Sequence, residues 1–332
     1  MKQGTSWLIA ATIAGAAYPI MPVALYAMAK MKTDPGIHAA LIAAGLAVVF
    51  AVPLAGVVLL CVSAGTSEVA ELRTRAAGIL LVLAPALLVL SRVLASVAGF
   101  RASLAVPVWF GFWTLVTIGI VWRSATPRSL LPSSVSRGLR VMHRLIFAFV
   151  LLFIAAHLAV NLMALRDLAA YNLAAAWLRL AYRTPAGEPL LLALLALQMG
   201  SGLALALDTG ISRTSFEHVC QVAAGLFIAA FLTSHTLAVA VLGRGWLDRG
   251  PMFAFASAGP GGLLSSAQGA ALLPYYGLSV VSLTVHLARP IGLNVLRKAG
   301  AAPARVAVAV LICLGVVISA LLLVALVTPP SR

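Results

Sequence analysis

Residues 140–166 read RVMHRLIFAFVLLFIAAHLAVNLMALR, an apolar run between arginines that is interrupted in its second half by His157. About 20 apolar residues are enough to cross a bilayer as a helix. The whole chain shares this character, since 62% of its 332 residues are hydrophobic, 9% are charged and the mean hydropathy is +1.07. A soluble domain has about 25% charged residues. The composition excludes a soluble enzyme, a disordered tail and a disulfide scaffold, and predicts an all-α, polytopic transmembrane helical bundle in the lipid bilayer.

Basic residues outnumber acidic ones, with 23 Lys and Arg against eight Asp and Glu, for a net charge of +15. A basic chain can bind nucleic acid, but these bases are scattered between apolar runs instead of forming one face. Bases that flank membrane spans are the ordinary explanation. We therefore expect no nucleic-acid partner. The three cysteines each lie inside an apolar run without metal-ligand spacing, and we interpret them as small apolar side chains.

The apolar runs predict nine membrane spans, and the basic residues between them predict the orientation. The densest basic cluster lies in residues 123–144, and a second lies in residues 297–305. Because cytoplasmic loops are rich in Lys and Arg, we expect a multi-pass protein of a bacterial-type inner (plasma) membrane with its N-terminus in the cytoplasm. Lys30 and Lys32 then lie outside, in mild conflict with this rule. The expected spans are 5–29, 37–62, 76–98, 102–122, 140–165, 188–208, 217–242, 270–291 and 304–328.

Two segments between the spans are long. Residues 166–187 mix Tyr, Trp and Arg with Ala and Leu, which predicts an amphipathic helix in the membrane interface. Residues 243–269 are rich in Gly, Pro and Ser, which predicts an irregular loop.

Ionisable side chains inside a membrane are costly, so they mark candidate functional sites. All eight acidic residues lie at or near the ends of the expected spans, which leaves no buried carboxylate pair for proton transfer or metal binding. The chain has no phosphate-binding loop, GxSxG or HExxH motif. Histidines are the remaining candidates, and five of the six fall in three expected spans: His143, His157, His218, His235 and His286.

His157 and His235 are predicted to lie deep in the membrane at one level. Each precedes by nine residues the first arginine at the outer end of its helix, Arg166 or Arg244. At 1.5 Å per residue, both imidazoles lie about 13 Å inward of that arginine. Two neutral imidazoles at one level on neighbouring helices are what a six-coordinate b-type haem requires. The alternative is that each is a core histidine bonded to a backbone carbonyl.

A second level of histidines is predicted near the inner surface. His143, His218 and His286 each lie close to a charged residue, so any of them could be interfacial and inert. His143 and His157 are 14 residues apart, about four turns, and they project from nearly the same helix face about 21 Å apart. That separation suits two stacked haems, or one haem and one quinone site.

Several motifs in the second half of the chain are similar to those of a known family. The run at 140–165 contains VMHRL and AAHL, residues 197–202 read LQMGSG, residues 221–235 contain QVAAG and FLTSH, and residues 275–287 contain YYG and HL. These motifs resemble the cytochrome b membrane-anchor subunits of succinate dehydrogenase and fumarate reductase. Similar domains anchor bacterial class III adenylate cyclases. The resemblance implies a five-helix cytochrome b-like unit over residues 136–328, after a four-helix region, residues 1–135, of unknown role.

The resemblance also implies the ligands. In the two-haem type of this family, the first and third motif helices share one haem, which corresponds to His157 and His235. The other haem would use the second and fourth motif positions, here Gln198 and His286. Glutamine departs from the family's histidine and is a poor haem ligand. We expect one haem b, with a second haem either lost or ligated by His143 or His218 instead.

The sequence thus predicts a membrane b-type cytochrome that passes electrons between quinone and a partner. The quinone would bind near the inner surface, at His143, Arg144 and Ser136. Substrate chemistry would belong to a cytoplasmic redox or signalling subunit, so an electron-transfer or sensor subunit is expected more than an enzyme by itself. One alternative is a haem-binding sensor or anchor without turnover. Another is a transporter or lipid-handling protein with structural histidines, although the sequence has no visible two-half symmetry.

Overall fold

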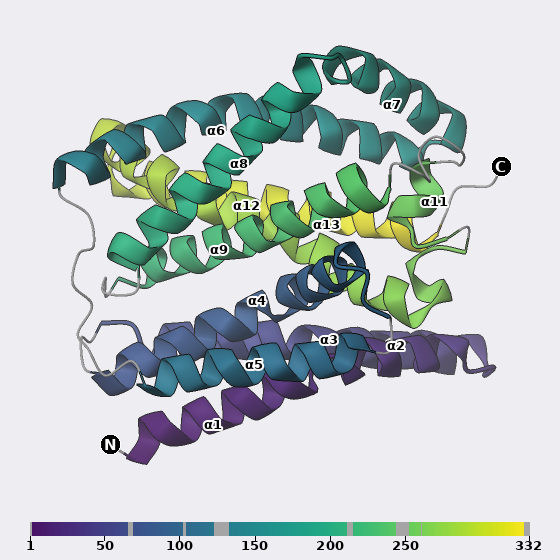
Figure 1. Cartoon of the computed structure of the whole chain (residues 1–332), viewed down its shortest axis with the longest axis horizontal. Helices are drawn as coiled ribbons and strands as arrows, with labels where there is room; N and C mark the ends of the chain where they lie inside the picture. The colour runs from purple at the N-terminus through teal and green to yellow at the C-terminus, as the bar shows by residue number, and fades with distance from the viewer. Residues whose placement is uncertain are drawn as a thin grey trace.

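The computed structural model describes residues 2–65, 69–101, 104–122, 133–210, 215–243, 252–259 and 261–328. Every regular element within these residues is a helix, which confirms the predicted all-α architecture (Figure 1). In chain order the elements are α1 (Lys2–Ala17), α2 (Ile20–Lys30), α3 (Pro35–Val62), α4 (Val69–Val97), α5 (Ala105–Trp122), α6 (Ser133–Leu162), η2 (Met163–Leu165), α7 (Leu168–Tyr182), α8 (Gly187–Leu205), η3 (Ala206–Gly210), α9 (Phe216–Leu237), η4 (Ala238–Leu242), α11 (Met252–Ala256), η5 (Leu263–Ser265), α12 (Ala267–Ala299) and α13 (Ala301–Val327).

Among the described residues, seven helices are long and apolar enough to cross a membrane: α3, α4, α6, α8, α9, α12 and α13. The helices α1 and α2 pass the same test only together, as a pair bent by 49°, which raises the number of spans to as many as eight. The apolar part of α5, Ala105–Gly119, is shorter. A multi-pass helical membrane protein is therefore confirmed. The span expected at 5–29 corresponds to the bent pair, and the one expected at 102–122 corresponds to α5.

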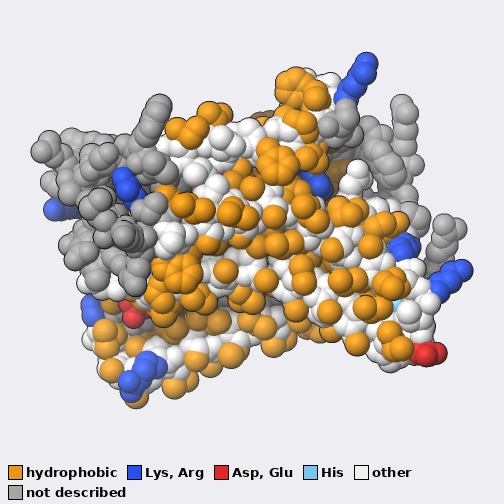
Figure 2. Space-filling view, turned by 90° about the horizontal axis from the view of Figure 1, so that it is seen from below, with side chains coloured by type: hydrophobic (Ala, Val, Ile, Leu, Met, Phe, Trp, Pro, Cys, Tyr) orange, Lys and Arg blue, Asp and Glu red, His pale blue; other side chains and the backbone are white. Residues whose placement is uncertain are grey.

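The surface of the molecule matches a lipid environment. Leu145, Phe149 and Leu152 on α6 are 62%, 68% and 73% exposed. On the face seen from the side of α1, apolar side chains cover the middle, and Lys and Arg side chains gather toward the ends (Figure 2). Apolar surface this extensive is unusual for a soluble monomer but is expected where lipid is the solvent.

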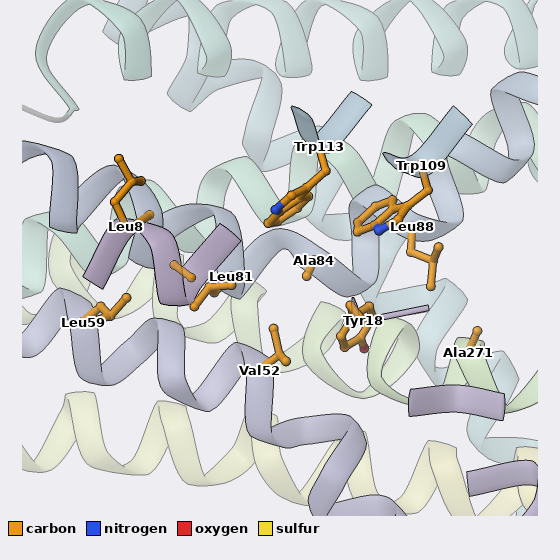
Figure 3. Close-up of a cluster of buried hydrophobic side chains, with 12 residues drawn as sticks. Leu8, Tyr18, Val52, Leu59, Leu81, Ala84, Leu88, Trp109, Trp113 and Ala271 are labelled. Carbon is orange, nitrogen blue, oxygen red and sulfur yellow. The ribbon is translucent and has the colours of Figure 1, made fainter. Parts of the chain in front are cut away.

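Two tryptophans of α5 pack against the break between α1 and α2. The indole Nε1 of Trp109 donates to the carbonyl oxygen of Ala16 at 3.2 Å, and that of Trp113 donates to the carbonyl oxygen of Thr12 at 3.0 Å. The Ala16 carbonyl lies in the last turn of α1, where the break removes its helical partner. Tyr18, at the break itself, is buried with both indoles in a cluster that includes α3 and α4 (Figure 3).

The helix α4 joins the N-terminal helices to the C-terminal ones. It packs against α1 and α3 on one side and against α9 and α12 on the other. Gly56 of α3 and Gly78 of α4 allow these two helices to approach closely, since a Cβ at Gly56 would lie 2.6 Å from the Gly78 carbonyl oxygen. The N-terminal helices therefore support α9, which carries one of the deep histidines.

The helices α6, α8, α9 and α12 surround the candidate site. Each of α6–α8, α8–α9 and α9–α12 is a contacting pair, and α13 lies along α12 (Figure 1). Ile146 and Val150 of α6 pack on Leu195 of α8. Buried Phe227 of α9 packs in the same cluster as Tyr275 of α12. These contacts fix the rotation of each helix about its axis and so determine where its histidines point.

The segment expected to form an interfacial helix, 166–187, contains the helix α7. Asp167 caps its N-terminus by accepting a hydrogen bond from the Ala170 backbone N–H at 2.6 Å. One face of α7 is buried through Tyr171, whereas Trp177 on another face is 67% exposed. In the segment expected to be irregular, 243–269, the described residues contain the short helices α11 and η5 and the start of α12. Arg244 and residues 123–132 of the basic cluster 123–144 lie outside the described residues.

Candidate functional site

His157 of α6 and His235 of α9 form a direct pair, which we call the outer pair. Their ring centroids are 6.0 Å apart and their planes are inclined by 67°. Equal depth was predicted from sequence, but equal depth does not by itself make two rings neighbours. The packing of α6 and α9 around the same hollow brings them together.

A phenylalanine stacks on each imidazole of the outer pair. The Phe153 ring lies 6.0 Å from the His157 ring at 17°, and the Phe231 ring lies 5.3 Å from the His235 ring at 9°. Each phenylalanine precedes its histidine by four residues, so the two rings share a helix face. This stacking limits how far either imidazole can swing. The repeated FxxxH spacing is a sequence signal that could have identified both phenylalanines.

The hydrogen bond from Asn161 defines the protonation of His157. The Asn161 side-chain amide donates to His157 Nε2 at 3.3 Å. A nitrogen that accepts a hydrogen bond carries a lone pair, so the proton of this neutral ring is on Nδ1. Nε2 of His157 is therefore in the state that binds a metal, and the amide is a neutral group that a stronger ligand can displace.

A hollow, the outer cavity, is lined by both rings of the outer pair. Its volume is about 260 Å³, slightly below the 300–1,000 Å³ of a typical small-molecule site. Its lining is mostly aliphatic and aromatic. Burial raises the pKa of the Tyr171 phenol at this lining, so the hydroxyl stays neutral. The charged side chains of the lining come from the end of α7 and the start of α8: Arg179, Arg183 and Glu188.

His143 of α6 and His286 of α12 form a second pair, the inner pair. Their ring centroids are 6.5 Å apart and their planes are inclined by 75°. Nδ1 of His286 donates to the backbone carbonyl of Gln221 at 2.9 Å, and Nδ1 of His143 donates to Ser201 Oγ at 2.9 Å. Metal-binding histidines are commonly oriented in this way, with one nitrogen held by the protein and the other left for the metal.

Gln198, which the resemblance places opposite His286, lies beside His143. Its side-chain amide donates to His143 Nε2 at 3.1 Å, and its Oε1 is buried without a hydrogen-bond partner. Ser201 donates to the Gln198 carbonyl at 3.1 Å, which leaves its hydroxyl oxygen free to accept from His143. The ring that lies next to His286 is His143. As with Asn161 on His157, a side-chain amide rests on the Nε2 of an α6 histidine.

The other candidates of the inner surface are dispersed. Arg144 is exposed and does not line a cavity with His143. Ser136 is buried and accepts a hydrogen bond from Arg140. His218 does lie on the wall of the hollow beside the inner pair. The three residues expected to bind a quinone carbonyl are therefore not gathered around one point.

A second hollow, the inner cavity, has His143 and His286 on its wall and a volume of about 150 Å³. Glycines lie against both rings. A Cβ at Gly202 would be 3.1 Å from His143 Cε1, and a Cβ at Gly225 would be 2.9 Å from both Cε1 and Nδ1 of His286. Each imidazole occupies space that any other residue would fill. The glycines of LQMGSG and QVAAG thus have a steric role that the sequence motifs alone did not reveal.

The described residues contain no group of three or more His, Cys, Asp or Glu side chains that could hold a bare metal ion. Each histidine pair offers only two ligands. Comparison of the chain with models of protein families, with curated proteins and with solved structures gave no match. The function is therefore argued from the geometry of the two pairs.

Proposed function

We propose that this chain is an integral membrane b-type cytochrome that holds a haem between His157 and His235. The observation that carries the proposal is the 6.0 Å separation of these two rings in the lining of the mostly apolar outer cavity. A haem iron already has four nitrogen ligands from its macrocycle, so two facing imidazoles complete it. This accounts for two-histidine sites in a chain whose described residues offer no three-ligand cluster.

The ring separation agrees with simple bond geometry. A metal–imidazole bond is about 2.0 Å. A five-membered ring with bonds of about 1.33 Å places each nitrogen about 1.1 Å from the ring centre. Two imidazoles that both bound one metal ion would therefore have their centroids at most about 6.2 Å apart. The measured separations, 6.0 Å for the outer pair and 6.5 Å for the inner pair, lie on either side of this value.

The surroundings also fit a flat apolar macrocycle. Phe153 and Phe231 stack on the imidazoles, and the lining of the outer cavity is mostly aliphatic and aromatic. A bound haem supplies one-electron redox chemistry. The protein's own contribution is two oriented imidazoles, a low dielectric and an anchored position in the membrane.

The inner pair supports a second haem with a changed ligand. The resemblance assigns that haem to Gln198 and His286, but His143 is the ring that stands 6.5 Å from His286. Nε2 of both rings is unprotonated because Nδ1 of each donates to a neighbouring helix. We therefore propose His143 and His286 as its ligands, with Gln198 as a neighbour. A quinone in the inner cavity is the weaker proposal, because Arg144 and Ser136 do not join His143 there.

Two haems at these positions suit electron transfer across the membrane between quinone and a cytoplasmic redox or signalling partner. The alternative, a haem-binding sensor or anchor without turnover, would differ from an electron-transfer protein only in how its haem is reduced by quinol. Added quinol should reduce the haem of an electron-transfer protein rapidly and completely, whereas a sensor has no need for this. A transporter with structural histidines would bind no haem at all.

The test is a reduced-minus-oxidised absorption spectrum of the purified full-length chain. We expect a b-type α-band, lost or strongly reduced in His157→Ala and His235→Ala. The control is His38→Ala, because the His38 ring bonds to the Met31 carbonyl far from both cavities along the chain. Absence of the α-band from the unmodified protein would refute the proposal.

A further inference from the structure

The outer cavity has charge at one end only. Arg179 in the last turn of α7, Arg183 just after it and Glu188 in the first turn of α8 all line the cavity. The rest of the lining is dominated by aliphatic and aromatic side chains. Two cations against one anion leave a surplus of positive charge at this end. A ligand that fills the cavity should therefore be apolar over most of its area and anionic at one edge.

Arg183 has a buried donor without a hydrogen-bond partner. This donor is its Nε, whereas its backbone N–H donates to the Arg179 carbonyl at 2.7 Å. Arg166, in contrast, is 80% exposed and pairs with Asp167 at 3.3 Å. A buried N–H donor without a partner is costly, and a guanidinium matches a carboxylate in both charge and geometry. Arg183 is therefore suited to bind an acidic group of a ligand.

Aromatic contacts connect Tyr182, the residue before Arg183, to the outer pair. The Tyr182 ring lies 5.4 Å from the Phe153 ring, and Phe153 in turn stacks on His157 at 6.0 Å. Arg183 itself lines the same cavity as the two imidazoles.

We propose that Arg183, with Arg179 beside it, binds the propionate carboxylates of the haem that His157 and His235 ligate. This inference rests on the proposed function and specifies which edge of the haem points to α7. Arg183 supplies N–H donors and charge, and Arg179 adds charge. Glu188 opposes the carboxylates, so its negative charge limits the net attraction.

The experiment compares two forms of the cofactor. The full-length chain is produced without haem, purified in detergent and titrated with haem b or with its dimethyl ester, whose propionates carry no charge. The unmodified protein should bind the free acid about tenfold or more tightly than the ester, as expected for charge-assisted hydrogen bonds. Arg183→Gln should lose most of this preference by weakening binding of the acid alone, and Arg183→Lys should keep part of it.

Matched variants separate a local effect from a general one. Glu188→Gln should increase the preference for the free acid, opposite to Arg183→Gln, whereas Arg166→Gln should leave it unchanged. Redox titration gives an independent readout, because loss of a nearby cation stabilises the ferric form, and so Arg183→Gln should lower the midpoint potential. Equal binding of acid and ester by the unmodified protein, or an unchanged preference in Arg183→Gln, would overturn this inference and leave the histidine ligation intact. Binding of neither form would overturn both.

Discussion

Gly202 and Gly225 place two imidazoles where any side chain would collide with them. A methyl group at Gly225 would lie 2.9 Å from two atoms of the His286 ring, and that ring is already held by the Gln221 carbonyl. The ring cannot yield without giving up this hydrogen bond. At the inner pair, the glycines that face the rings from neighbouring helices are thus as important as the histidines themselves.

Gly225→Ala should remove the haem of the inner pair. We expect the haem content of the purified chain to fall from about two per protein to about one, measured against protein concentration, because the displaced His286 ring no longer faces His143. The matched control is Gly200→Ala on α8, where a Cβ meets nothing within 4 Å. Equal haem content in Gly225→Ala and the unmodified protein would contradict the steric role.

Substitutions at His143 and Gln198 distinguish the two ligand assignments. His143→Ala should lower haem content to one per protein and leave the midpoint potential of the remaining haem in place. Gln198→Ala should retain both haems, because the glutamine donates to His143 and is not required opposite His286. The reverse result, with haem lost in Gln198→Ala and kept in His143→Ala, would restore the assignment that the resemblance implies.

At the scale of the helix, continuous elements were predictable and their breaks were not. Long apolar runs locate α3, α6, α9 and α13 because a span needs only length and hydrophobicity. The division of the first span into α1 and α2 could not be read from its prolines, since membrane helices often tolerate proline. The depth match of His157 and His235 was readable from one-dimensional spacing. The pairing of His143 with His286 was not, because it depends on how far α12 is rotated about its own axis.

Trp109→Phe should weaken the N-terminal helices. The substitution keeps an aromatic ring but removes the N–H that donates to the Ala16 carbonyl at the break. A buried carbonyl left without a partner costs about 1–3 kcal/mol. Thermal unfolding of the chain in detergent should therefore occur at lower temperature. Trp177→Phe is the control, since Trp177 is 67% exposed on α7 and its loss should leave the unfolding temperature nearly unchanged.

Over the whole molecule, the structure places the basic end of α12 at the same end of the bundle as the start of α6 (Figure 1). Lys298 lies at that end, and Arg166 lies at the opposite end beside α7. The excess of basic residues predicts that the Lys298 end faces the cytoplasm. The all-α architecture could therefore be predicted from composition. The packing of α4 between the N-terminal helices and the pair α9 and α12 could be seen only in the three-dimensional structure.

Cysteine labelling tests this orientation. In a chain whose native cysteines are replaced, Lys298→Cys should react with a membrane-impermeant maleimide only after the membrane is permeabilised, and Arg166→Cys should react in intact cells. The two variants serve as controls for one another. Labelling of Lys298→Cys in intact cells, with protection of Arg166→Cys, would invert the predicted topology.

The two histidine pairs are nested along the chain, since His143 and His286 enclose His157 and His235 in sequence. During synthesis α6, which carries one member of each pair, is made before α9 and α12, which carry the other members. The outer pair can form once α9 is made, whereas the inner pair can form only after α12 is made. Under the proposed function, the two ligands of the outer haem are therefore made before those of the inner haem, and α12 and α13 then complete the lining of the outer cavity.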